Sequence, residues 1–195
     1  MRVTALLAAL LAGCSGTMAQ ETPHAASGPK AAGVDAPAER LPTDVRRATI
    51  IVRDIENSLR LYRDVIGLAV NYDTTVETSG VALPAGEPGA TARLVLLNAN
   101  DPWVGWIGLM EWIDPAIPAG DYPRRMGPGD VVLVLNTDDV EGRCARAKEI
   151  PGVTFTAEPR LQVYPGRDGG ADIRVKGCNF FDPDGILIEL NQILD

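Results

Sequence analysis

The sequence predicts an α+β fold in which two β-α-β-β-β modules pair within one chain. Three observations lead to this prediction. An order of strand, aspartate and amphipathic helix occurs twice, with Asp54-Ile55-Glu56 in the first copy and Asp139-Val140-Glu141 in the second. Strand-like segments separated by turn signals follow each copy. The chain has 195 residues, of which 46% are hydrophobic, and this is enough for one domain core.

Composition argues against several classes of function. The chain has 26 acidic residues against 18 lysines and arginines, a net charge of −8, which is the wrong sign for holding a phosphate backbone. We therefore expect no nucleic-acid partner. The single histidine, His24, lies in a segment rich in Ala, Pro and Gly. Catalytic Ser-His-Asp triads and multi-histidine metal sites are therefore not expected.

Residues 1–13 predict a lipoprotein signal peptide. Arg2 is followed by an apolar run that is too short to span a bilayer. The run ends in Leu-Ala-Gly-Cys14, which resembles the bacterial lipobox and implies lipidation of Cys14. With Ser15 beside it, the resemblance implies a cell-envelope protein, anchored at the periplasmic face of the outer membrane. The alternative is an ordinary secretory signal cut near Ala19.

The rest of the chain divides into a tether and one domain. Ala, Pro, Gly and Thr dominate residues 14–43, which predicts a disordered tether because so few large apolar side chains cannot form a core. The folded domain is predicted over residues 44–195. Its first module covers about 45–115 and its second about 129–194.

The first module begins with a predicted strand before Asp54. A helix follows, with Ile55, Leu59, Tyr62 and Ile66 on one face, and Gly67 ends it. Further strands are predicted around 69–76 and over 92–100 and 106–113.

The second module repeats this order. Asp139 is predicted to cap a helix with Val140, Cys144 and Ala147 on one face, and Pro151-Gly152 ends it. Strands are predicted around 153–163 and over 171–181 and 186–194, with a tight turn at Asp182-Pro183-Asp184-Gly185. Each module alone would leave one sheet face bare, so we expect the two sheets to enclose a shared cavity.

Cysteines 144 and 178 remain once Cys14 is assigned to the lipid anchor. An oxidising compartment would permit a disulfide between them, and the alternative is two buried free thiols. Both interpretations stay open because the sequence does not fix the distance between the two residues.

The repeat resembles the vicinal oxygen chelate superfamily, which includes glyoxalase I, extradiol dioxygenases, fosfomycin-resistance enzymes and bleomycin-binding proteins. The most specific matching segments are residues 52–59, 62–68 and 181–190, and the resemblance covers about 45–194. It implies a cup between the modules. In metal-dependent members this cup holds a divalent ion through residues on the first and last strand of each module.

These ligand positions give a mixed result in this chain. Glu111 and Glu189 match the two last-strand positions and are the candidate metal ligands, with Glu111 taken as the repeat partner of Glu189. The first-strand positions fall on Arg47 and Val132, neither of which can ligate a metal. We therefore expect no metal cofactor and an ion pair between Arg47 and one of the glutamates. Calcium or magnesium held by both glutamates and water is the alternative.

Four further side chains complete the predicted ligand-binding set with Arg47, Glu111 and Glu189. Arg93 is interpreted either as a partner for an anionic group or as part of a solvated face. Trp103, in a turn after Pro102, is interpreted as a stacking residue at the cup mouth or as core, and the face with Trp106 and Trp112 is expected to pack on the helices. Asn179 and Phe181 are placed beside the cup by the resemblance.

These observations predict a cell-envelope lipoprotein whose glyoxalase-like, bleomycin-resistance-like domain binds a small molecule without the usual metal. The alternative is a metal-dependent enzyme, lyase or dioxygenase-like, that uses Glu111 and Glu189. A third hypothesis is a structural or partner-binding lipoprotein with a degenerate cup. Dimers are common among related folds, so a homodimer is compatible with the resemblance. The sequence assigns no catalytic residue and no ligand.

Overall fold

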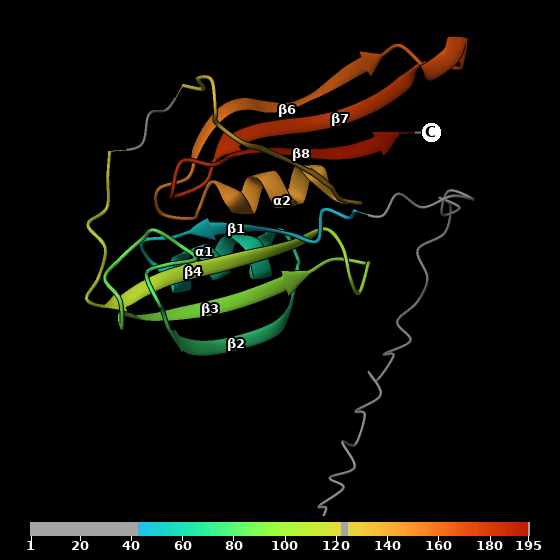
Figure 1. Cartoon of the computed structure of the whole chain (residues 1–195). Coiled ribbons are helices and arrows are strands. Elements are labelled where there is room, and N and C mark those ends of the chain that lie inside the picture. The colour runs from blue at the N-terminus through green and yellow to red at the C-terminus, as the bar shows by residue number, and fades with distance from the viewer. Residues whose placement is uncertain (1–42, 122–124, 195) are drawn as a thin grey trace, which may run out of the picture.

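The computed structural model describes residues 43–121 and 125–194 (Figure 1). The predicted signal peptide, nearly all of the predicted tether, and both Cys14 and His24 lie outside the described residues. Within the described ranges, no helix combines the length and the apolar character needed to cross a membrane.

Module one is a four-stranded sheet with one helix. Its elements are β1 (Arg47–Ile51), α1 (Ile55–Leu59), the π-helical continuation η1 (Arg60–Val65), β2 (Ala69–Glu77), β3 (Thr91–Asn98) and β4 (Trp106–Asp114). The strands lie in the order β1-β4-β3-β2, and β1 runs parallel to β4. Asp54 begins the helix as predicted, because its Oδ1 accepts a 3.0 Å hydrogen bond from the Asn57 N–H.

Module two repeats the plan. Its elements are β5 (Val132–Asn136), α2 (Val140–Ala147), β6 (Thr154–Tyr164), the short 3₁₀ turn η2 (Arg167–Gly169), β7 (Ile173–Phe181) and β8 (Leu187–Leu194). The strand order is β5-β8-β7-β6, again with the first strand parallel to the last. Asp139 caps α2 through the Gly142 N–H at 2.9 Å. The predicted fold of two paired β-α-β-β-β modules is confirmed.

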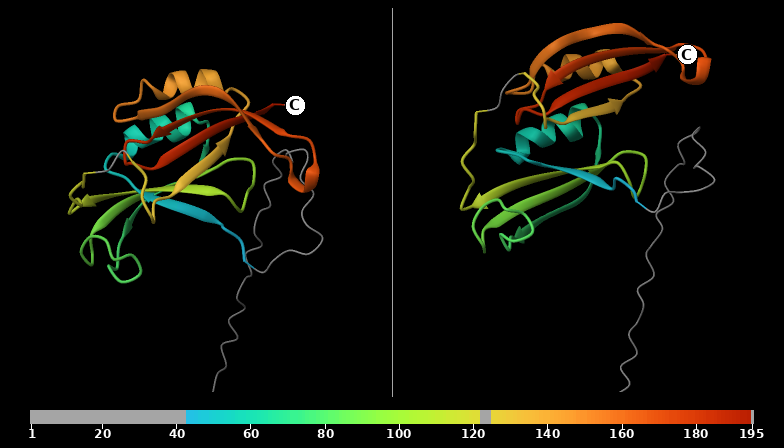
Figure 2. Two further views of the ribbon diagram at one scale, coloured as in Figure 1. Left: turned by 90° about the horizontal axis from the view of Figure 1, so that it is seen from above. Right: turned by 45° about the horizontal axis from the view of Figure 1, so that its top comes forward.

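One hydrophobic core joins the two modules. Each sheet turns one face, here called its helical face, toward this core. Sheet one contributes Val95, Leu97 and Leu109, and sheet two contributes Phe180, Ile188 and Leu190. Side chains from α1, η1 and α2 lie in the same core. Figures 1 and 2 show module two stacked on module one with the helices close together.

The turn between β7 and β8 ties module two to module one. The Tyr62 hydroxyl donates a 2.7 Å hydrogen bond to Asp182, and the Arg53 side chain donates a 3.0 Å bond to Asp184. Tyr62 and Asp182 are fully buried. The pKa of the Asp182 carboxyl is raised overall. Burial is the largest cause and outweighs the hydrogen bonds from Tyr62, Ile186 and Asp184, which lower the pKa. Burial and the nearby Asp182 carboxylate raise the pKa of Tyr62.

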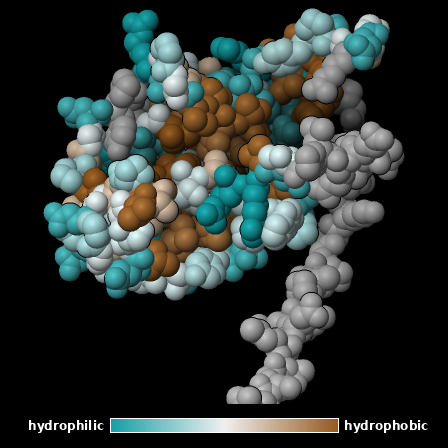
Figure 3. Space-filling view, in the orientation of Figure 1, coloured by the Kyte–Doolittle hydropathy of each residue, from teal (hydrophilic) through white to brown (hydrophobic). Residues whose placement is uncertain are grey.

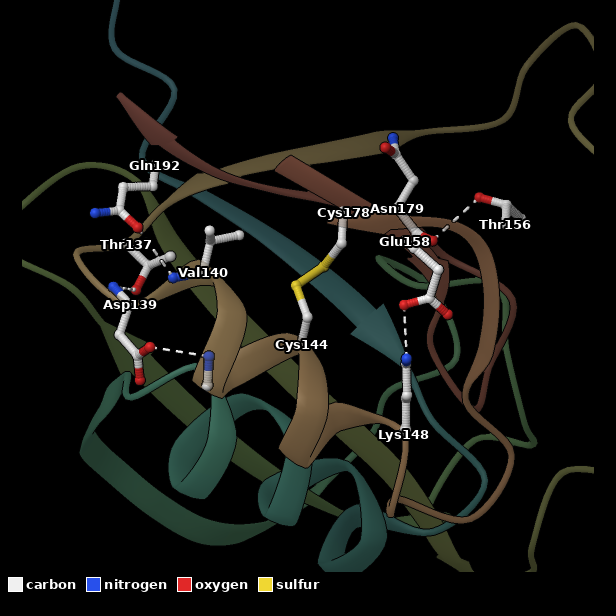
Figure 4. Close-up of a disulfide and its surroundings, with 11 residues drawn as sticks. Thr137, Asp139, Val140, Cys144, Lys148, Thr156, Glu158, Cys178, Asn179 and Gln192 are labelled. Atoms are coloured by element: carbon white, nitrogen blue, oxygen red, sulfur yellow. Dashed lines mark hydrogen bonds and ion pairs between the residues drawn. A yellow bond between two sulfur atoms is a disulfide. The ribbon is translucent and has the colours of Figure 1, made fainter. Parts of the chain in front are cut away.

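Cys144 and Cys178 form a disulfide, which settles the alternative left open by the sequence. The bond joins α2 to β7, with the two Cα atoms 6.6 Å apart and a sequence separation of 34 (Figure 4). Both cysteines are fully buried in the shared core. Module two is therefore covalently fastened across its helix-sheet contact.

A second, smaller core lies on the other face of sheet one. It contains Met110 and Trp112, packed under the loop between β2 and β3. Gly86 in this loop has a positive φ of 68°, and a side chain there would collide with the Trp112 indole. Trp112 is thus core, but the expectation that its face packs on the helices is wrong. The helices pack on the face of Ile107 and Leu109.

Candidate functional site

The strand registers correct the alignment of the two modules. Arg47 lies opposite Trp106 in sheet one, and Val132 lies opposite Leu187 in sheet two. Trp106 of β4 therefore corresponds to Leu187 of β8. Two residues further along each strand, Gly108 corresponds to Glu189. Glu111 comes three residues later and is therefore not the repeat partner of Glu189. An odd shift along a strand moves a side chain to the other face of the sheet.

Glu111 instead corresponds to Gln192, and both cap a helix. Glu111 Oε2 accepts a 3.0 Å hydrogen bond from the Ile55 N–H at the start of α1. Gln192 Oε1 accepts a 3.3 Å bond from the Val140 N–H at the start of α2 (Figure 4). A carboxylate is also favourable beside the positive end of a helix dipole. Glu111 therefore lies on the helical face of sheet one.

Glu189 lies on the opposite face of sheet two, because Ile188 and Leu190 on either side of it point into the core. Its Oε1 accepts a 3.0 Å hydrogen bond from the Asn191 amide. A side chain at Gly177 would collide with that amide, so Gly177 leaves the room that Asn191 occupies. Asn179 lies directly opposite Glu189 in β7. The structure thus brings Asn179 and Glu189 together.

The side chain of Arg47 occupies the space beside Gly108 in sheet one. A Cβ at Gly108 would come within 3.2 Å of Arg47 Cδ and 2.8 Å of the Thr49 hydroxyl. Among the described residues, no ion pair joins Arg47 to Glu111 or Glu189. The expected pairing of Arg47 with one of these glutamates is therefore wrong. The main-chain contact of Glu111 and the amide contact of Glu189 take its place.

The remaining predicted site residues lie apart from one another. Arg93 is on the helical face, where it binds Asp73 at 2.7 Å and Glu56 at 2.5 Å and lowers the pKa of Asp73. Trp103 is half exposed, and the Arg46 guanidinium lies 3.8 Å from its ring centre. Phe181 is buried. Arg93 therefore lies on the helical face of sheet one, whereas Glu189 lies on the opposite face of sheet two.

The metal of the superfamily that the sequence resembles does not fit these residues. The first-strand positions are Arg47 and Val132, and the counterpart of Glu189 is Gly108, none of which offers a ligand atom for a divalent ion. Glu111 is committed to a helix end on the other face of its sheet. In the part of the chain that the structure describes, no group of three or more His, Cys, Asp or Glu side chains could hold a metal ion.

A cleft of about 820 Å³ lies between the two modules. We call it the inter-module cleft. Module one lines it with residues 66–69 and 98–100, and module two lines it with residues 134–138, Arg143, Gln192 and Ile193. Figure 3 shows apolar side chains gathered in the middle of the molecule, where the modules meet. None of the site residues named from the sequence lines this cleft. Its only sequence signal is the pair of polar segments Asn98-Ala99-Asn100 and Asn136-Thr137-Asp138, each at a strand end.

The ionisable side chains that line the cleft are Arg143 and Asp138, which lie 3.7 Å apart. Arg143 Nη1 also donates to the carbonyl oxygens of Val65 and Ile66, at 2.8 and 2.5 Å. These carbonyls end η1, so the guanidinium caps the negative end of that helix. Gly67, with a φ of 88°, ends the helix as predicted and leaves space for Arg143. The cleft is therefore balanced in charge.

One solved structure agrees with this architecture, and two further solved structures are more distantly similar. A glyoxalase family protein from Bacillus cereus has a TM-score of 0.61 and 18% identity, covering 83% of this chain and 100% of its own. An antibiotic-binding protein from a Streptomyces species has a TM-score of 0.46 and 22% identity, with coverage of 80% and 100%. A fosfomycin resistance protein from Listeria monocytogenes, solved with Mn(II) and sulfate, has a TM-score of 0.42 and 17% identity, with coverage of 78% and 93%.

Sequence comparison identifies the family. No curated protein matches the chain. The family model named Glyoxalase/Bleomycin resistance protein/Dioxygenase superfamily matches residues 45–190, which include strands β1 to β7 and the first half of β8. The chain therefore belongs to the glyoxalase/bleomycin resistance protein/dioxygenase superfamily.

Proposed function

We propose that this protein binds a small organic molecule in the inter-module cleft, without a divalent metal, while anchored in the cell envelope. The cleft carries this proposal. Its volume of about 820 Å³ is within the range of small-molecule sites, and both modules line it. Apolar side chains such as Leu68 and Val134 alternate there with polar groups that can orient a ligand.

The chemistry of the side chains supports binding without metal. The site that would hold the ion in metal-dependent relatives has an arginine, a valine and a glycine at three of its positions. The cleft itself contains one carboxylate, Asp138, which is paired with Arg143. One paired carboxylate is too few ligands for a divalent ion.

The Cys144–Cys178 disulfide supports a location outside the cytoplasm. Disulfides persist in oxidising compartments and are rare in reducing ones. The lipobox-like segment ending at Cys14 supports the same location and suggests the means of attachment.

Labelling of cells with a radioactive fatty acid, for the wild type and Cys14→Ala, tests the anchor. Loss of label in the variant is expected, and label retained on it would contradict lipidation.

Two matched valine substitutions test the binding site. Val134 in the cleft and Val163 on β6 are 61% and 53% exposed, so tryptophan at either position should leave folding intact. We expect Val134→Trp to fill the cleft and abolish binding, while Val163→Trp binds as the wild type does. The measurement is ligand-observed NMR with a mixed library of neutral, anionic and cationic fragments. Equal binding by both variants would overturn the proposal.

Elemental analysis of protein purified without chelator separates this function from the metal-dependent alternative. We expect no stoichiometric iron, nickel, zinc or manganese. Stoichiometric metal that is lost on Glu189→Gln would overturn metal-free binding and favour an enzyme. Asn71→Asp, at an exposed position on β2, is a control for general effects of substitution.

A further inference from the structure

We propose that the inter-module cleft recognises neutral molecules through amide groups, of the kind found in short uncharged peptides. This inference rests on the proposed function and specifies the class of ligand. It comes from the unused hydrogen-bonding groups of the cleft walls, from their balanced charge and from the strand edges that border them.

The cleft is rich in side-chain amides, namely Asn98, Asn100, Asn136 and Gln192. Gln192 uses its oxygen at the start of α2, which leaves its NH₂ group as donor. Asn98 uses its NH₂ group on the Ala99 carbonyl, which leaves its oxygen as acceptor. Within the described ranges, neither Asn100 nor Asn136 has a side-chain hydrogen bond. Donors and acceptors are thus both available, as an amide ligand requires.

Charge in the cleft favours a neutral ligand. Arg143 is committed to two carbonyls of η1 and to Asp138, so it offers little to an anion. The net charge of −8 on the whole chain repels anions further. Asp138 has an exposed side chain that already faces Arg143, so a cation gains little from it.

Two sheet edges border the cleft. β2 and β5 are the outermost strands of their sheets, and Ala69 of β2 and residues 134–136 of β5 line the walls. The outer edge of such a strand presents main-chain N–H and C=O groups without a strand partner. These groups bind peptide amides in the same way as a neighbouring strand does. Main-chain and side-chain groups in the cleft therefore favour the same class of ligand.

A peptide and its ester analogue test the proposal. The probes are acetyl-trialanine amide and the same molecule with its central amide replaced by an ester, which removes one N–H donor. We expect the ester to bind at least about tenfold more weakly, because a cleft acceptor is left unpaired. Acetylated peptides with three aspartates or three lysines should also bind more weakly than trialanine. Isothermal titration calorimetry of the full chain measures all four.

A matched pair of variants places the effect in the cleft. Asn136→Asp replaces donor N–H groups with charge at the cleft wall, and Asn71→Asp makes the same change at an exposed position of β2 outside it. We expect trialanine binding to fall about tenfold in the first variant and to stay unchanged in the second. An ester that binds as tightly as the amide, a charged peptide that binds better, or equal effects of both variants would overturn the amide proposal. If the wild type binds another fragment but no peptide, and Val134→Trp abolishes binding of that fragment, only the ligand class is wrong. If no probe binds the cleft, the proposed function fails as well.

Discussion

The two modules share a strand plan but differ in what holds each helix on its sheet. In module two, Cys144 of α2 is bonded to Cys178 of β7. The corresponding positions in module one, counted from the helix cap and the strand register, are Leu59 and Val95, which are both buried in the shared core. At this pair of positions the helix-sheet contact is thus covalent in module two and apolar in module one. A repeated fold does not require a repeated means of stabilisation.

The turns of the two modules differ just as clearly. The turn Asp182–Gly185 is inserted against module one, where Ser58 and Tyr62 bind its carboxylates. Its counterpart in module one, the segment from Asp101 to Gly105, is largely exposed and presents Trp103 to solvent. The interface between the modules is therefore asymmetric. Its buried hydrogen bonds between side chains join the turn of module two to Ser58 of α1 and Tyr62 of η1.

Replacing Asp182, the buried aspartate of the turn in module two, should have the largest effect on the free energy of unfolding. Asp182→Ala leaves the Tyr62 hydroxyl and the N–H groups of Asp184 and Ile186 without their acceptor. We expect a loss of about 3–5 kcal/mol in the free energy of unfolding, measured by urea titration. Asp101→Ala removes the acceptor of the exposed Trp103 and Val104 N–H groups and should cost about 1 kcal/mol. Equal losses would show that the two turns are energetically equivalent.

Breaking the disulfide should have the next largest effect. The loop it closes is long, so we expect reduction to lower the free energy of unfolding by about 2–4 kcal/mol. The measurement is urea unfolding with and without a reductant. The double variant C144A/C178A is the control, because its stability should not respond to reductant. If reduction leaves the free energy of unfolding of the wild type unchanged, the disulfide does not stabilise module two.

Lowering the pH should change the stability contributions of Asp182 in module two and Asp73 in module one in opposite directions. The pKa of Asp182 is raised in the folded state, so its contribution to stability is greatest below its unfolded pKa and is lost as pH rises through the folded value. The pKa of Asp73 is lowered by Arg93, so its contribution is present above its unfolded pKa and is lost as pH falls.

Unfolding measurements between pH 3 and 7 on Asp182→Asn and Asp73→Asn test these signs. The stability difference between wild type and Asp182→Asn should grow as pH falls, and that for Asp73→Asn should shrink. The same sign in both variants would contradict the opposed environments of the two carboxylates.

Exchanging the helix-capping side chains should have the smallest effect. Glu111→Gln removes a negative charge from the start of α1, and Gln192→Glu adds one at the start of α2. We expect the first to cost and the second to gain about 0.3–1 kcal/mol, measured by thermal unfolding at low salt. Both effects should decrease at high salt. If neither responds to salt, the caps act through hydrogen bonding alone.

The sequence by itself determined the features that depend on neighbouring residues. The capping aspartates, the end of the first helix at Gly67 and the tight turn after Phe181 all follow from local chemistry, and the internal repeat extended them to the whole fold. The pairing of Asn179 with Glu189 was predictable for the same reason, because a short turn joins their antiparallel strands.

Only the tertiary structure decided which face Glu111 occupies, whether the cysteines meet and where a cleft forms. Loops of different length separate the strands of the two modules, so counting along the chain does not give the register, and a shift of three residues reversed the face of Glu111. The inter-module cleft draws its walls from five separate parts of the chain. Such sites depend on distances between segments far apart in sequence, and packing of the core fixes those distances, whereas local propensity does not.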